Sequence, residues 1–216
     1  MLVGPLITLI ACPIFMVATQ KENTLGIWLF KTLAALGFII AALECGALST
    51  TYGIIIFAGL ILCLGGDVLL IPKSNSIFLM GIGSFLLGHV AFAVAFATAG
   101  IDLTSTLISC VPMGVVAFLV LKWLGPHLDG LMKKAVPAYI LAITIMVILA
   151  IGCAIQHNAP WVAIGAIGFM LSDLAVARER FVASGFINKV WGTPLYFAAQ
   201  VVIAMTTAAN VIQTTA

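Results

Sequence analysis

The chain is an almost unbroken succession of apolar stretches, each long enough to cross a lipid bilayer as a helix. Hydrophobic residues make up 63% of the 216 residues and charged residues only 7%, against roughly 25% charged in an ordinary soluble domain. A soluble fold of this length cannot bury so much apolar surface, whereas a membrane span needs about 20 apolar residues. The sequence therefore predicts an all-α integral membrane protein, with residues 1–216 forming a single polytopic transmembrane domain.

Hydropathy and helix-breaking residues divide the chain into eight predicted transmembrane helices with short connections. The first apolar stretch has no basic segment before it, so we expect a helix there rather than a cleavable signal peptide. The predicted spans are residues 2–18, 26–42, 52–71, 77–99, 104–123, 134–153, 160–177 and 190–211.

Positive charge is confined to one set of connections. All nine Lys and Arg residues lie in or beside the odd-numbered connections or, like Lys31, in the first turns of the second predicted helix. The positive-inside rule therefore predicts that the odd connections are cytoplasmic and that both termini lie outside, an N-out, C-out topology. We expect the protein in the bacterial inner (cytoplasmic) membrane. The net charge of +2 does not indicate nucleic-acid binding, because the basic residues flank helices.

Two of the seven acidic residues lie inside predicted spans, Asp67 in the third and Asp173 in the seventh. A charged side chain near the bilayer centre costs roughly 2.5–3.5 kcal/mol on insertion scales, so such a residue is a functional-site hypothesis by default. Both acids lie about five residues from the cytoplasmic end of their helix, or roughly 7–9 Å at 1.5 Å per residue. An ion pair with Lys31 would explain one of them, whereas two acids at one depth favour chemistry.

A weak internal duplication accompanies the two acids. When Asp67 is aligned with Asp173, Gly59 also matches Gly165. The offset is four helices, so we predict a weak 4+4 parallel repeat.

The other polar side chains of the predicted helices lie mostly in the same half of the bilayer as the two aspartates. His89 lies near the midplane of the fourth helix, and Tyr139 lies low in the sixth. The eighth helix carries a polar stripe at i, i+4 spacing, which places its members on one helix face. We therefore expect one cavity that opens to the cytoplasm. The stripe consists of Asn188, Gly192, Tyr196 and Gln200.

Four short motifs, in this order and spacing, resemble the YhhN/TMEM86 family of eight-helix membrane proteins, and the resemblance covers essentially the whole chain. That family includes lysoplasmalogenases, which hydrolyse the vinyl-ether bond of lysoplasmalogens to a fatty aldehyde and a glycerophospho-base. Its members often have Lys-Pro in the second helix, whereas here Lys31 is followed by Thr32. The motifs are Gly66-Asp67-Val-Leu-Leu, Phe85-Leu-Leu-Gly-His89, Leu171-Ser-Asp173-Leu-Ala and Tyr196-Phe-Ala-Ala-Gln200.

The resemblance implies a hydrolase that takes a lysophospholipid from the membrane and needs no metal or organic cofactor. Vinyl-ether hydrolysis passes through an oxocarbenium ion, and paired carboxylates serve a similar transition state in glycosidases. We expect Asp67 and Asp173 to be the acid/base pair, in an order that the sequence leaves open. The residues expected to bind the substrate or orient water are Lys31, His89, Asn188, Tyr196 and Gln200, and Lys73 is expected beside Lys31 at the lipid phosphate.

Two other functions fit some of these features. A small-molecule or proton-coupled transporter would also contain membrane acids, a midplane histidine and parallel repeats. The outer halves of the predicted helices, however, offer few polar groups to line an exit path. An intramembrane aspartyl protease needs a Gly-x-Gly-Asp motif, and Leu64 stands where the first glycine should be.

Overall fold

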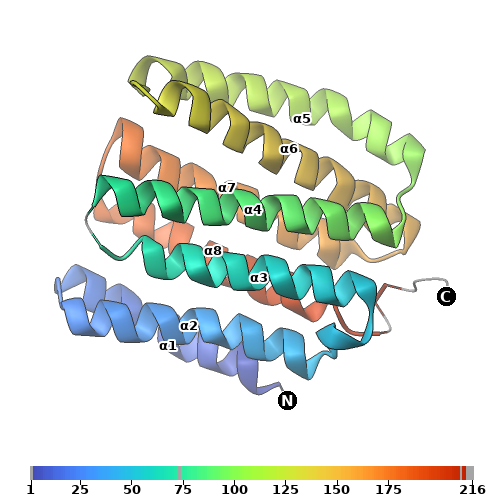
Figure 1. The fold of residues 1–216 in the computed structure, drawn as a ribbon, viewed down its shortest axis with the longest axis horizontal. Coiled ribbons are helices and arrows are strands. Elements are labelled where there is room, and N and C mark those ends of the chain that lie inside the picture. Colours follow the sequence, from blue (N-terminus) through green and yellow to red (C-terminus); the bar gives the residue numbers. More distant parts are fainter. Residues whose placement is uncertain (1, 73, 210, 213–216) are drawn as a thin grey trace.

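The described residues form a bundle of eight long α-helices, as many as the sequence predicts (Figure 1). The computed structural model describes residues 2–72, 74–209 and 211–212, and these residues contain no β-strand. Seven of the helices, α1 to α7, are long and apolar enough to cross a membrane, while α8 is less apolar because it carries the polar stripe. The helices are α1 (Val3–Gln20), α2 (Thr24–Glu44), α3 (Thr51–Leu69), α4 (Asn75–Ala99), α5 (Leu103–Leu124), α6 (Met132–Gln156), α7 (Pro160–Ala177) and α8 (Phe186–Met205).

The eighth helix differs most from the sequence-based boundaries, because α8 begins four residues earlier and ends six residues earlier than 190–211. Gly185 ends the preceding connection, and helical backbone bonding then begins with the Asn188 amide donating to the Gly185 carbonyl oxygen. At the other end, the hydroxyls of Thr206 and Thr207 donate to backbone carbonyl oxygens three residues back. Such side-chain bonds compete with helix continuation.

The helices alternate in direction, so the connections sort into two sets (Figure 1). The connections α1–α2, α3–α4, α5–α6 and α7–α8 lie at one end of the bundle, on the left in the view. The even connections lie at the other end, together with the start of α1 and the end of α8. The connections that carry the positive charges therefore share one end, and the assignment of that end to the cytoplasm stays a prediction.

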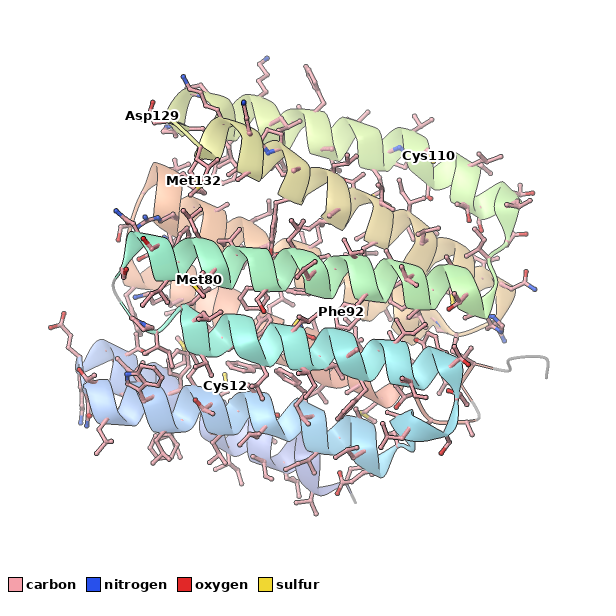
Figure 2. All side chains as sticks on the ribbon, in the orientation of Figure 1. Cys12, Met80, Phe92, Cys110, Asp129 and Met132 are labelled. Atoms are coloured by element: carbon pink, nitrogen blue, oxygen red, sulfur yellow. The ribbon has the colours of Figure 1, made fainter. Side chains whose placement is uncertain are left out.

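The side walls of the bundle are apolar. Large hydrophobic side chains are exposed along most helices, among them Leu9, Leu107 and Val111. Nitrogen and oxygen atoms gather mainly at the two ends, as at Asp129 in the α5–α6 connection (Figure 2). This distribution matches an integral membrane protein whose walls contact lipid.

Close packing of helices through small residues positions the site. A Cβ atom on Gly66 would lie 2.6 Å from the Phe85 ring, so α3 and α4 approach more closely than a larger residue would allow. A Cβ atom on Gly192 would likewise collide with that of Ala175, which holds α8 against α7. Small residues allow such contacts in membrane proteins. Both seams lie beside the candidate residues, since Gly66 precedes Asp67 and Ala175 follows Asp173.

Candidate active site

The Asp67 carboxylate is buried between α2, α3 and α8. The Tyr196 hydroxyl donates a hydrogen bond to its Oδ2 over 2.6 Å. The Lys31 ammonium lies 3.4 Å from its Oδ1 and donates to the Asp67 carbonyl oxygen over 2.9 Å. Lys31 thus provides the compensating charge that a buried carboxylate requires. The structural ion pair considered for one of the two acids is present at Asp67.

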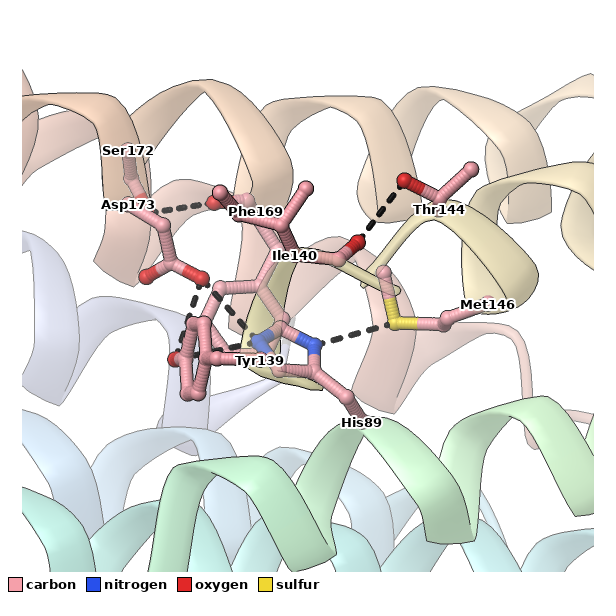
Figure 3. Close-up of polar contacts among 8 residues, drawn as sticks. All are labelled: His89, Tyr139, Ile140, Thr144, Met146, Phe169, Ser172 and Asp173. Carbon is pink, nitrogen blue, oxygen red and sulfur yellow. Dashed lines mark hydrogen bonds and ion pairs between the residues drawn. The ribbon is translucent and has the colours of Figure 1, made fainter. Parts of the chain in front are cut away.

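The Asp173 carboxylate belongs to a second polar group, formed by α4, α6 and α7 (Figure 3). Its Oδ2 lies 3.0 Å from His89 Nε2 and accepts a hydrogen bond from the Tyr139 hydroxyl over 3.2 Å. The other ring nitrogen of His89, Nδ1, lies 3.3 Å from the Met146 sulfur, which can only accept. Both ring nitrogens therefore face acceptors.

An aromatic layer separates the two acids. The Phe169 ring lies against His89, with centroids 4.2 Å apart, and also against Tyr196, with centroids 5.6 Å apart. Phe85 adds a second ring, 5.8 Å from Tyr196 and 6.3 Å from Phe169. Among the described residues, no hydrogen bond or ion pair joins Asp67 to Asp173. The two acids lie at equal depth but belong to two neighbouring polar groups. The Phe169 ring packs against both groups, and each carboxylate has hydrogen-bond partners of its own.

The partners of the two acids follow the same pattern in the two halves of the chain. Asp67 on α3 has a partner on α2 and another on α8. Asp173 on α7, four helices later, has partners on α6 and on α4. Each acid thus contacts the preceding helix of its own half and the last helix of the other half. The pattern agrees with the expected parallel repeat, which stays a prediction.

The Asp173 centre opens onto an apolar cavity between α4, α5, α6 and α7. Its volume, counted as the space that water-sized molecules can fill, is about 80 Å³. The side chain of Asp173 is 15% exposed and that of Asp67 only 4%. Asp67 does not line this cavity. The polar side chains in the lining are those of Tyr139, Thr144 and Asp173.

Gln200 is fully buried, and neither its Nε2 nor its Oε1 has a hydrogen-bond partner among the described residues. It follows Tyr196 by one turn of α8, deeper in the bundle. A buried carboxamide without partners costs free energy, and such groups often hold an ordered water. Gln200 is therefore a buried polar group in the site with free hydrogen-bonding capacity.

Asn188 is also buried, but its carboxamide is used within the α7–α8 connection. Its Nδ2 donates to Glu179 over 2.7 Å and to the Ala183 carbonyl oxygen over 2.8 Å, and its Oδ1 accepts from Arg178. It precedes Tyr196 by two turns, about 12 Å along the helix axis. The structure does not bring Asn188 together with either aspartate. Lys73 lies outside the described residues.

Sequence reasoning did not assign a site role to three residues that the structure places there. Tyr139 was visible as a polar residue in an apolar helix, and that signal pointed to the cavity. Phe169 and Met146 are apolar residues in apolar helices and carry no such signal. Within the described part of the chain, no group of three or more His, Cys, Asp or Glu side chains is placed to hold a metal ion.

Comparison with known proteins identifies relatives over most of the chain. The model of the YhhN family matches residues 26–207. The chain is 27% identical over 185 residues to "Lysoplasmalogenase TMEM86A" of Bos taurus and of Homo sapiens, covering 83% of this chain and 72% of each relative. It is 33% identical over 153 residues to "Lysoplasmalogenase" of Mycobacterium bovis, covering 67% of this chain and 56% of that protein. No solved structure has significant similarity to the chain.

Proposed function

The chain belongs to the YhhN family, and we propose that it hydrolyses the vinyl-ether bond of lysoplasmalogens to a fatty aldehyde and a glycerophospho-base. The relatives that match it are named lysoplasmalogenases. The observation that carries the proposal is the position of Asp173, a carboxyl group in the wall of an otherwise mostly apolar cavity. A single-chain lipid with one cleavable polar bond needs a site of this kind. The lining must be apolar where it contacts the hydrocarbon chain, and it must present an acidic group at the bond that is cleaved.

The first step is the transfer of the proton from the Asp173 carboxyl group to the vinyl carbon distal to the ether oxygen. The double-bond electrons form the new C–H bond, and the ether oxygen and its neighbouring carbon become an oxocarbenium ion. Water then adds to that carbon and returns a proton to the carboxylate. The resulting hemiacetal collapses to the aldehyde and the glycerol hydroxyl, so the net reaction consumes one water.

His89 and Tyr139 position Asp173 for this step. Both groups contact Oδ2, which leaves Oδ1 free of protein partners among the described residues. Proton transfer from a positioned side chain contributes typically 10²–10⁴-fold to a rate. We assign the proton-donating role to Asp173 because it lines the cavity.

Asp67 is the second acid of the proposed pair. Its carboxylate is bonded to Tyr196, and the Tyr196 ring packs on Phe169 of the other centre. In the low-dielectric interior the charge of a carboxylate acts over longer distances than in water, which favours a cation at the neighbouring centre. Gln200, with its free hydrogen-bonding groups, is the candidate to hold the attacking water.

The cavity lies in the half of the bundle that contains the charged odd connections. Its lining includes Leu124, Met132 and Phe181, which adjoin those connections. We therefore propose that the substrate enters from the cytoplasmic side. In an Asp129→Cys variant, residue 129 in the exposed α5–α6 connection should react with an impermeant maleimide only after the membrane is opened. Labelling of this residue in intact cells would contradict the proposal and place the odd connections outside the cell.

Purified protein is incubated with a lysoplasmalogen and, separately, with its 1-acyl ester analogue. We expect aldehyde from the vinyl ether and no fatty acid from the ester. In heavy water the aldehyde should carry deuterium at carbon 2, because the proton is delivered to that carbon. Asp173→Asn should lower turnover at least about 100-fold, and Asp67→Asn should also abolish aldehyde release. Asp129→Asn, at an exposed position, is the matched control.

Turnover near that of the unmodified protein in Asp173→Asn would refute the role of that residue. Fatty acid from the ester in comparable yield would refute the reaction class. Both variants are compared with the unmodified protein by thermal unfolding in detergent, so that loss of activity is separated from loss of fold.

A further inference from the structure

Arg180 is an exposed cation that stacks on Phe78, one of the residues that line the cavity. It lies in the π-helical turn Arg178–Val182 that continues α7. Its Nη2 donates to Asn75 Oδ1 over 2.7 Å, and its guanidinium carbon lies 4.3 Å from the centroid of the Phe78 ring. Phe78 itself lines the cavity. A guanidinium that is stacked on one side and hydrogen-bonded at one nitrogen keeps its other N–H donors for a ligand.

No carboxylate among the described residues lies within ion-pair distance of Arg180. The adjacent acid, Glu179, is used elsewhere: it accepts hydrogen bonds from the Gly185 amide, the Ser184 hydroxyl and the Asn188 carboxamide. The positive charge of Arg180 is therefore fixed in position and not balanced by a neighbouring acid. Such an arginine suits a phosphate, which its planar fork can bind through two hydrogen bonds.

The spacing between Arg180 and Asp173 matches a lysophospholipid. Arg180 follows Asp173 by seven residues, or roughly 10 Å along the helix axis, because α7 continues directly into the π-helical turn at Arg178. Asp173 lines the cavity, and Arg180 directly precedes the lining residue Phe181. In a 1-alkenyl lysophospholipid a glycerol unit separates the phosphate from the vinyl ether. A phosphate within reach of the Arg180 side chain therefore leaves the vinyl ether near Asp173.

We propose that Arg180 binds the phosphate of a single-chain phospholipid whose hydrocarbon chain occupies the cavity. The phosphate lies at the Arg180 end, and the chain runs past Asp173 between α5 and α6 toward Val116 and Thr144. The assignment of the lipid as a vinyl ether rests on the proposed function, whereas recognition of the phosphate does not. Arg180 is thus a specificity residue that selects phosphate-bearing lipids over uncharged glycerol ethers.

The test measures equilibrium binding of two radiolabelled, non-hydrolysable lipids to the full chain in nanodiscs. One lipid is a saturated 1-alkyl lysophospholipid, and the other is the matching 1-alkylglycerol, which lacks phosphate. Arg180→Gln should weaken binding of the phospholipid roughly 10- to 100-fold, as expected for the loss of hydrogen bonds to a charged group, and leave binding of the alkylglycerol unchanged. Lys122→Gln, which removes an exposed cation from the last turn of α5, should change neither.

Equal binding of the phospholipid by Arg180→Gln and the unmodified protein would overturn the proposal. So would competition by inorganic phosphate as effective as that by the lysophospholipid, because that result would indicate a free-anion site. Unchanged binding of the alkylglycerol also shows that the variant is folded. For hydrolysis we expect a raised KM with an unchanged kcat, since Arg180 does not touch the reacting carbon.

The two proposals can fail separately. Binding that depends on Arg180 in a protein that releases no aldehyde would contradict the hydrolase and support the phosphate site. Aldehyde release with the same KM in Arg180→Gln would support the hydrolase and contradict the phosphate site.

Discussion

The Lys31 ammonium lies 3.4 Å from the Asp67 carboxylate and donates a hydrogen bond to the carbonyl oxygen of the same residue. This double contact ties α2 to α3 at the depth of the site. It also distinguishes the two membrane acids. Asp67 has a basic residue of the chain as its counter-charge, whereas Asp173 is held by His89 and Tyr139 and faces a cavity.

Removal of the Lys31 charge alone should destabilise the protein more than removal of the Lys31 and Asp67 charges together. Lys31→Met leaves a buried carboxylate without a cation, which costs roughly 3–5 kcal/mol and should lower the thermal unfolding midpoint in detergent. The double variant Lys31→Met/Asp67→Asn removes both charges and should recover most of the stability. Lys21→Met, at an exposed position, should have no effect.

The same pair of variants tests the role of Asp67 in the reaction. The double variant should stay inactive although it is stable, because the second acid is missing. Recovery of both stability and turnover in the double variant would make Asp67 a purely structural residue.

Tyr139→Phe should lower the rate of aldehyde release roughly 10-fold, because its hydrogen bond to the Asp173 carboxyl group is lost. The fold should tolerate the change, since only the hydroxyl is removed. Tyr52→Phe is the matched control: its hydroxyl is buried and bonded to Thr206 over 2.7 Å, at the other end of α3 from Asp67. We expect Tyr52→Phe to lower the unfolding midpoint and leave turnover unchanged. Equal rates in the two variants would contradict the positioning role of Tyr139.

Gln200→Met should separate stability from activity. The carboxamide is buried without partners, so its replacement by an apolar side chain of similar length should preserve the unfolding free energy or raise it by about 1–3 kcal/mol. Turnover should fall, because Gln200 is proposed to hold the attacking water. Steady-state kinetics and thermal unfolding of the same preparation check both parts. Unchanged turnover would exclude Gln200 from water binding.

Ala117→Phe should shorten the chain that the cavity accepts. Ala117 lines the cavity on α5, and a phenyl group there occupies space proposed for the hydrocarbon chain. We expect KM to rise for long-chain lysoplasmalogens and to change little for short-chain ones. Ala97→Phe, on an exposed surface of α4, is the control and should leave the chain-length preference unchanged. An equal effect on all chain lengths would contradict the proposed path of the chain.

The sequence by itself determined the properties that depend on position along a helix. Apolar stretches of bilayer length predicted eight helices, which the bundle confirms. The lysines and arginines predicted that the odd connections are cytoplasmic, and that orientation stays a prediction. The depth of Asp67 and Asp173 followed from counting residues, because the rise of an α-helix is constant. The stripe that contains Tyr196 and Gln200 followed from its helical period.

Only the tertiary structure decided which side chains meet. Contact depends on the order in which helices pack and on their rotation, and neither is encoded in depth along one helix. The same depth therefore allowed Lys31 to pair with either acid, and packing assigned it to Asp67. Packing also placed Phe169 between His89 and Tyr196, so that two acids expected in one cavity occupy adjacent centres. Asn188 lies on the predicted stripe, but the α7–α8 connection folds back on it and uses all its donors.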